Sequence, residues 1–129
     1  MSALDELSAS RYVSLTTFKK DGTGRPTPVW VLRDGDRLLV WSAADAWKVR
    51  RVRRDPRVLV APCDVRGRVA GPPVEGTARV TSREEMPRVL RLLVAKYGFQ
   101  ARMTLLGGRL RRRFRSPLDT TVGIYITLA

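Results

Sequence analysis

Side chains with binding chemistry gather between residues 27 and 54 of the chain. Thr27-Pro28-Val29-Trp30 is a short and largely apolar run, and Trp41-Ser42 places a hydroxyl beside an indole. Lys48, Arg51 and Arg54 then follow at intervals of three residues, which brings their charges to one face of a helix. A flat apolar wall, a hydroxyl and a basic helix face together suit a ring-containing ligand that carries a phosphate.

Pro28 adds a constraint on the backbone around it. Proline has no N–H to give to a neighbouring strand, so its position must be an edge, a bulge or a place where the strand faces a ligand. Residue types and spacing also allow a simpler interpretation. A buried strand followed by a solvated basic helix produces the same pattern.

The missing residue types exclude several classes of enzyme. The chain has no histidine and a single cysteine, Cys63. Zinc hydrolases, nucleophile systems that depend on histidine and histidine-ligated haem are therefore excluded, and no metal site is expected. The sequence also lacks a Walker A motif, a dinucleotide-binding glycine fingerprint and a nucleophile elbow.

The net charge of +13 points to an anionic partner, because 25 lysines and arginines face 12 acidic residues. Nucleic acid is one candidate, and a cofactor with phosphate and carboxylate groups is another. High-GC coding bias also enriches a chain in arginine, and it explains part of the excess without any function.

Length and hydropathy predict one folded domain over residues 1–129. The apolar runs are too short to cross a bilayer, so no membrane partner is expected. The N-terminal residues carry acids where a signal peptide carries positive charge, which favours a cytoplasmic location.

The elements that must position these side chains are mainly strands. Asp21-Gly22 and Asp34-Gly35 predict tight turns between the first three of them. Runs rich in β-branched and aromatic residues predict six strands, over residues 12–18, 27–32, 38–42, 57–63, 72–80 and 120–128.

Helices are predicted between the strands. Residues 2–10 form a short amphipathic helix, and Asp45 is the expected N-cap of a helix over residues 46–54. Ser82 and Glu85 form a capping box that opens a helix to about Tyr97, with Gly98 as its stop. A further basic helix over residues 102–115 is expected to be interrupted at Gly107-Gly108. The fold class is therefore mainly β with helices (α+β): one six-stranded antiparallel barrel with helices in its gaps.

The stretch from Tyr12 to Val80 resembles the pyridoxamine 5'-phosphate oxidase-like superfamily of FMN-binding split barrels. It is most similar to the actinobacterial subgroup of coenzyme F420-dependent oxidoreductases. The resemblance rests on short motifs in the family's order: residues 12–17, Asp21-Gly22, residues 27–30, residues 48–51, residues 54–58, Ala61-Pro62-Cys63-Asp64, Arg66-Gly67, residues 74–80 and Lys96-Tyr97-Gly98.

The resemblance implies a split β-barrel homodimer with two cofactor sites at the subunit interface. It implies that Thr27, Pro28, Val29 and Trp30 line the ring system, and that Ser42, Lys48 and Arg51 hold the phosphate with Arg54 nearby. Cys63, Asp64 and Arg66 would complete the pocket from the partner chain. Trp47 departs from the family pattern, because relatives often carry a small residue before the lysine.

The implied reaction is hydride transfer from a reduced deazaflavin, coenzyme F420, to an unsaturated small-molecule substrate. FMN is the alternative cofactor, and a protein that binds the flavin or deazaflavin without turnover is another alternative. No residue stands out as a general acid. A nucleic-acid interface on the run from Arg109 to Arg115 is the competing hypothesis, but it lacks the aromatic platforms of single-strand binders.

Overall fold

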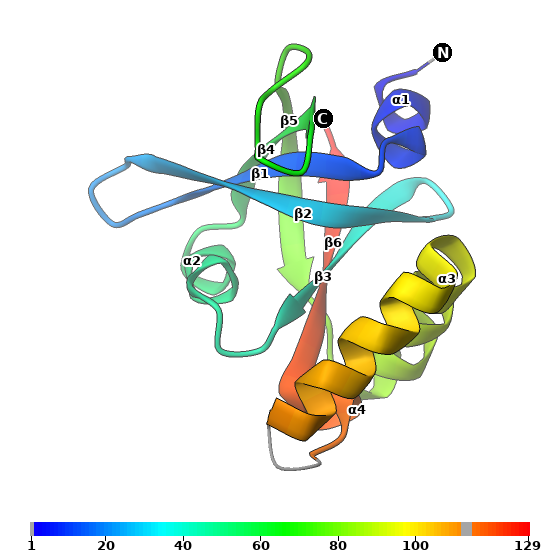
Figure 1. The fold of residues 1–129 in the computed structure, drawn as a ribbon. Coiled ribbons are helices and arrows are strands. Elements are labelled where there is room, and N and C mark those ends of the chain that lie inside the picture. The colour runs from blue at the N-terminus through cyan, green and yellow to red at the C-terminus, as the bar shows by residue number, and fades with distance from the viewer. Residues whose placement is uncertain (1, 112–114) are drawn as a thin grey trace.

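The computed structural model describes residues 2–111 and 115–129. Six antiparallel strands close into a barrel in the order β1-β2-β3-β6-β5-β4, which confirms the predicted fold class (Figure 1). Each predicted strand is present with small changes at its ends. Their bounds are β1 Tyr12–Phe18, β2 Gly24–Asp34, β3 Arg37–Ala43, β4 Arg57–Cys63, β5 Val74–Val80 and β6 Thr121–Leu128.

The barrel wall is split between β2 and β3, because the two strands share only part of their length. Residues 24–30 of β2 pair with β1, and only residues 31–34 pair with β3. On the facing strand, residues 41–43 of β3 pair with β6 alone. Pro28 lies in the part of β2 that pairs with β1 only, opposite Ser14, which agrees with the edge position that its missing N–H predicts.

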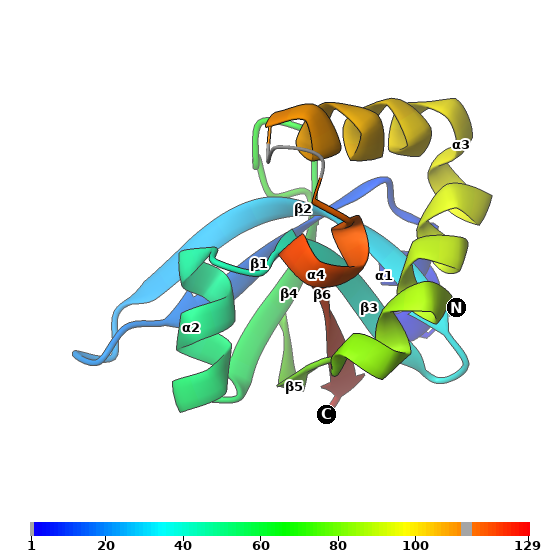
Figure 2. The same cartoon turned by 90° about the horizontal axis from the view of Figure 1, so that it is seen from below.

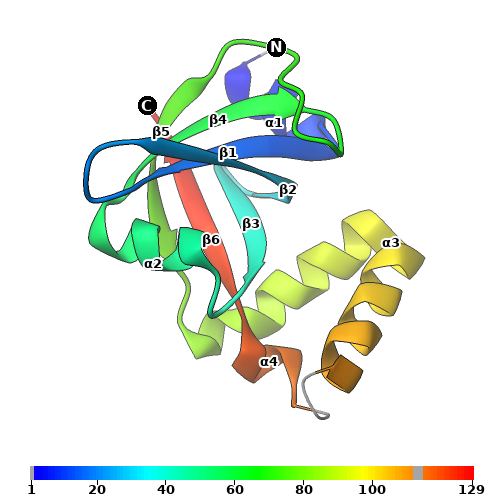
Figure 3. The same ribbon diagram turned by 60° about the vertical axis from the view of Figure 1, so that its left-hand side comes forward.

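Helices cover the ends and one outer face of the barrel. α2 and α3 lie on opposite sides of its lower end (Figures 1 and 3). The helices of the described residues are α1 Ala3–Ala9, α2 Trp47–Arg54, the 3₁₀ turn η1 Arg83–Glu85, α3 Met86–Arg111 and α4 Pro117–Thr120.

Two apolar cores hold these layers together. The first fills the barrel, where Val49 and Val52 of α2 and Leu7 of α1 join inward-facing strand residues. The second lies outside the barrel, where α3 packs Leu93 and neighbouring side chains against Leu32 and Leu39. Because α2 is buried through its two valines, its basic residues turn outward, and this fixes the side on which the cationic face lies.

Two expectations for the helices need correction, and one helix was not expected. Asp45 is not the N-cap of α2; that position is Ala46, and no side chain caps the helix there. Gly107-Gly108 does not interrupt α3, because a helical glycine costs only about 1 kcal/mol and the flanking turns tolerate it. The short helix α4 was not predicted, although Ser116 caps it and Pro117 is well placed in its first turn.

Gly98 separates α3 into two straight parts. Its backbone (φ 56°, ψ −125°) is not helical, so the predicted stop at this residue is confirmed, yet a second helix begins at once. Figure 2 shows the sharp change of direction between the two halves of α3. The predicted helix over residues 102–115 and the basic run from Arg109 both extend into residues 112–114, which lie outside the described residues. None of the helices described is long and apolar enough to cross a membrane.

Candidate cofactor site

A cleft of about 290 Å³ opens at the split between β2 and β3. One wall comes from Pro28, Val29 and Trp30 of β2, where the strand has lost its pairing with β3. The facing wall comes from the end of β3, and α2 closes one end. The lining residues are Tyr12, Pro28, Val29, Trp30, Trp41, Ser42, Ala43, Lys48 and Thr104.

Stacked aromatic rings give the cleft its flat wall. Trp30 lies 4.4 Å from the Tyr97 ring at 10° between planes, and 6.4 Å from Trp41 at 24°. Tyr97 is itself fixed, since its hydroxyl donates to the Arg11 carbonyl (2.7 Å) and accepts from the Val31 N–H (3.1 Å). Burial raises the pKa of Tyr97, so the ring stays neutral. The wall is therefore preorganised for a planar ligand.

Lys48 and Ser42 supply the polar groups of the cleft. Burial, together with the nearby charge of Arg51, lowers the pKa of Lys48. Ser42 is buried, and its hydroxyl donates to the Ala43 carbonyl at 3.0 Å. An anion beside Lys48 would relieve the repulsion from Arg51, so this end of the cleft favours a negatively charged ligand group.

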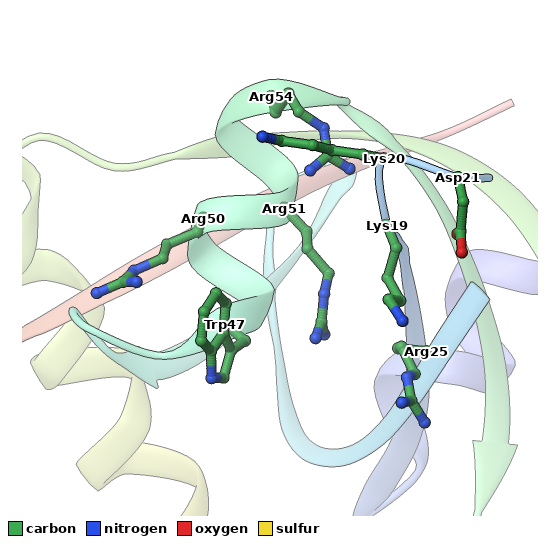
Figure 4. A pocket seen from close by; sticks show the side chains of 8 residues that line it. All are labelled: Lys19, Lys20, Asp21, Arg25, Trp47, Arg50, Arg51 and Arg54. Atoms are coloured by element: carbon green, nitrogen blue, oxygen red, sulfur yellow. The ribbon is translucent and has the colours of Figure 1, made fainter. Parts of the chain in front are cut away.

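A second hollow, of about 690 Å³, lies farther along α2, toward the hairpin between β1 and β2, and is here called the basic pocket. It is formed by α2 and the hairpin that joins β1 to β2. Figure 4 shows Arg51 extending toward Lys19 and Arg25 on the hairpin, whereas Arg50 points away. The lining residues are Lys19, Lys20, Asp21, Arg25, Trp47, Arg50, Arg51 and Arg54.

The basic pocket carries six cationic side chains against the single carboxylate of Asp21. Among the residues that the structure describes, the ion pairs involve other arginines, and none of these six cations forms an ion pair with a carboxylate. Arg54 donates to the Phe18 carbonyl, and Arg50 lies 4.8 Å from the centre of the Trp47 ring. Such a pocket attracts an extended anion with several charges.

The structure distributes the predicted site residues over three places. The cleft receives Pro28, Val29, Trp30, Ser42 and Lys48. Arg51 and Arg54 line the basic pocket instead. Thr27 pairs with Leu15 and is not among the residues that line either hollow.

Cys63, Asp64 and Arg66 lie at the end of β4 and in the loop after it. Cys63 is opposite Tyr12, so β1 and β2 stand between it and the split of its own chain. Asp64 accepts from the N–H groups of Arg66 and Arg68, both at 2.9 Å, which fixes the loop. Burial and the Asp64 charge raise the pKa of Cys63, so the thiol is protonated at neutral pH. A role for these residues in a partner's cleft stays a prediction.

Sequence reasoning assigned no role to several residues of the two hollows. Tyr12, Trp41 and Thr104 line the cleft, and Lys19, Lys20 and Arg25 line the basic pocket. Trp41 adjoins Ser42, and Lys19-Lys20 precedes the Asp21-Gly22 turn, so both lay close to motifs already noted. Thr104 gave no signal, because only the bend in α3 brings it to the split.

The chain matches a known protein family over most of its length. The family model described as pyridoxamine 5'-phosphate oxidase matches residues 2–121. The chain therefore belongs to the pyridoxamine 5'-phosphate oxidase family, as its motifs indicate. No curated protein sequence matches the chain.

Solved structures share the fold over nearly the whole chain. A conserved hypothetical protein from Mycobacterium tuberculosis is 22% identical with a TM-score of 0.70, covering 99% of this chain and 81% of that one. A putative pyridoxamine 5'-phosphate oxidase from Listeria innocua is 22% identical (TM-score 0.64, coverage 97% and 89%). A protein titled F420 reductase is 18% identical (TM-score 0.62, coverage 100% and 95%). At these identities the likeness establishes the split-barrel fold.

Proposed function

We propose that the protein is an oxidoreductase that binds the deazaflavin coenzyme F420 and transfers a hydride to an unsaturated organic substrate. The observation that carries the proposal is the junction of two hollows along α2. A flat aromatic cleft suits the ring system, and the basic pocket beside it suits an anionic tail. The similarity to a split barrel titled F420 reductase supports the same assignment.

The residues present fit such a cofactor part by part. The unpaired edge of β2 at residues 28–30 leaves backbone groups free for the edge of a ring, and Trp30 and Trp41 offer it flat contact. Lys48 lies where the cleft meets α2 and would hold the phosphate. Arg51 and Arg54 would bind the glutamate carboxylates beyond it.

The size of the basic pocket favours F420 over FMN. FMN ends at its phosphate, so it would leave six cations repelling one another at neutral pH. The polyglutamate tail of F420 brings several carboxylates to them. FMN remains the second candidate cofactor, since Lys48 and the cleft alone would hold a single phosphate.

Bound F420, when reduced, supplies two electrons and a proton as a hydride. The substrate's double bond would accept this hydride at one carbon and a proton from water at the other. The π bond is thereby lost, and the cofactor is oxidised. Lys48 and the aromatic wall orient the ring, and the cleft holds the substrate carbon against it.

The family resemblance extends the proposal to a homodimer whose cleft is completed by Cys63, Asp64 and Arg66 of the second chain. Exposed apolar side chains beside this loop support it: Val65 is 62% exposed and Val69 is 56% exposed. Val69 also lines an apolar groove of about 270 Å³ on the outer barrel face, with Leu59 and Pro73. Exposed apolar surface of this kind marks contact sites.

Fluorescence titration of the purified protein with F420 and with FMN tests the cofactor assignment. We expect micromolar or tighter binding of F420 and weaker binding of FMN. Added salt should lower the affinity for F420 more steeply than the affinity for FMN. Equal affinities would remove the preference for F420 over FMN, and tighter binding of FMN would assign FMN as the cofactor. Binding of neither cofactor, together with salt-dependent binding of DNA, would favour a nucleic-acid partner.

A further inference from the structure

A third cavity, of about 200 Å³, lies beside the cleft, between the end of β3, the second half of α3 and α4. Its α3 wall consists of residues spaced at i, i+1, i+4 and i+5, which form one face of the helix. The lining residues are Trp41, Ala43, Thr104, Leu105, Gly108, Arg109, Pro117, Thr120 and Thr121.

This cavity adjoins the cofactor cleft. Trp41, Ala43 and Thr104 line both spaces, so a molecule held in the cavity lies within one side chain of the ring site. A substrate that accepts a hydride must lie against the ring at this contact distance. The cavity therefore adjoins the place where the reacting molecule would meet the ring.

The cavity wall is apolar except for a few groups. Trp41, Leu105 and Pro117 form its flat and apolar part, and the threonines add hydroxyls. The indole N–H of Trp41 is buried and has no hydrogen-bond acceptor among the described residues. Arg109 is exposed and makes no ion pair with any residue that the structure describes.

We propose that this cavity is the substrate pocket and that it binds compact, flat, unsaturated carboxylates. The acid group would pair with Arg109, and the conjugated body would lie on Trp41 with its double bond toward the cleft. This inference rests on the proposed function, because it takes the cleft as the ring site. Arginine binds a carboxylate through two parallel N–H groups, so it gives both charge selectivity and orientation.

Two adjacent glycines provide a matched test. Gly108 lines the cavity and Gly107 does not, and a Cβ added at either would meet no described atom within 4 Å. Leucine at either position raises helix propensity to the same degree. We expect Gly108→Leu to fill the cavity and abolish ligand binding, whereas Gly107→Leu leaves it unchanged.

The probes are trans-cinnamate and its uncharged amide, cinnamamide, added to the cofactor-free full chain. Binding is followed by the Trp41 indole N–H signal in ¹H–¹⁵N spectra, assigned through Trp41→Phe. Cinnamate should shift this signal and bind about tenfold more tightly than cinnamamide, because one charge-assisted contact has that value. Arg109→Gln should remove the preference. Because Arg109 is exposed, this variant tests the proposal even where Gly108→Leu disturbs folding.

Equal binding to the Gly107→Leu and Gly108→Leu proteins would overturn the pocket assignment. Equal affinity for acid and amide, or a preference that survives Arg109→Gln, would overturn the carboxylate assignment. F420 titration of the same variants separates this inference from the proposed function. F420 binding without cinnamate binding refutes the pocket alone, whereas cinnamate binding without F420 binding leaves a carboxylate site and refutes the cofactor proposal.

Discussion

Lys48 connects the two hollows of the proposed site. It lines the cleft, while Arg51 on the next turn lines the basic pocket, and the arginine's charge contributes to the lowered pKa of the lysine. An anion bound between the two side chains would relieve this repulsion and keep Lys48 charged. We therefore expect Lys48 to contribute much of the binding free energy of an anionic group at the junction of the two hollows.

Lys48→Ala should weaken F420 binding by about 1–3 kcal/mol, because it removes a charge-assisted contact to phosphate. Fluorescence titration measures the loss. Arg53→Ala is the matched control, since Arg53 lies on the same helix, is exposed and lines neither hollow. Equal losses in the two variants would mean that only the net charge matters and that Lys48 holds nothing.

The affinity should also depend on pH through Lys48. Its pKa lies below the ordinary value of 10.5 in the free protein, so the lysine loses its proton at a lower pH than an exposed lysine does. F420 affinity should accordingly be highest where Lys48 is charged and should fall as pH rises through this lowered pKa. Titrations at a series of pH values test this, and Lys48→Ala should abolish the dependence.

At the scale of elements, the bend in α3 sets the shape of both the cleft and the adjoining cavity. Gly98 has the backbone angles φ 56° and ψ −125°, a combination that residues other than glycine avoid. Thr104 lines both the cleft and the cavity, Gly108 lines the cavity, and both residues follow the change of direction in α3. Figure 3 shows this bend.

Gly98→Ala should destabilise the protein by about 1–3 kcal/mol and move the second half of α3 away from β2. Gly107→Ala should instead raise the free energy of unfolding by up to about 1 kcal/mol, because Gly107 is helical and exposed. Urea unfolding of both variants measures the difference. A neutral Gly98→Ala would show that the bend does not require glycine.

Asp34 ties the β2–β3 turn to α3 and β6. Its carboxylate accepts from Arg88 at 2.6 and 2.8 Å and from the Tyr125 hydroxyl, and its side chain is only 10% exposed. Hydrogen bonds from Arg88 and then Tyr125 hold the pKa of Asp34 far below its ordinary 3.8. The charged form of Asp34 therefore stabilises the fold at pH values above 3.8.

That contribution should be lost as pH falls from about 4 through the lowered pKa of Asp34, because the unfolded chain takes up the proton first. We expect thermal stability to fall over this acid range in the natural protein. Asp34→Asn should be less stable at neutral pH and should show a weaker acid dependence. Calorimetry at a series of pH values compares the two, and parallel curves would contradict the role of Asp34.

At the scale of the whole molecule, the proposed dimer determines how the split is covered on its outer side. The proposed dimer places the loop after β4 over the cleft of the second chain, and the exposed Val65 and Val69 lie on this loop. A charge at Val69 would have to be buried in that interface, which is costly.

Val69→Glu should convert the protein to monomers in analytical ultracentrifugation and weaken F420 binding in parallel, because the cleft would lose its partner residues. Leu106→Glu is the matched control, since Leu106 is also about half exposed (51%) but lies on α3. We expect it to remain dimeric. Dissociation of the α3 variant alone would place the interface on that helix.

Much of this architecture was predictable from local patterns. Alternation of residue types and the Asp-Gly turns defined the six strands, and the valines of α2 defined which of its faces is buried. These signals are local, because turn geometry and side-chain alternation depend on residues close in sequence. The family motifs likewise identified Pro28, Val29, Trp30, Ser42 and Lys48, which the cleft brings together.

What only the tertiary structure decided is where charges and surfaces from distant segments meet. The divergence of β3 from β2 creates the cleft, and the hairpin of β1 and β2 adds its lysines to the arginines of α2. The bend at Gly98 adds Thr104 and Gly108. These meetings depend on barrel closure and helix packing over separations of many residues. No local pattern in the sequence encodes them, whereas the same sequence alone determined the barrel, its basic helix and the residue types that line the proposed cofactor site.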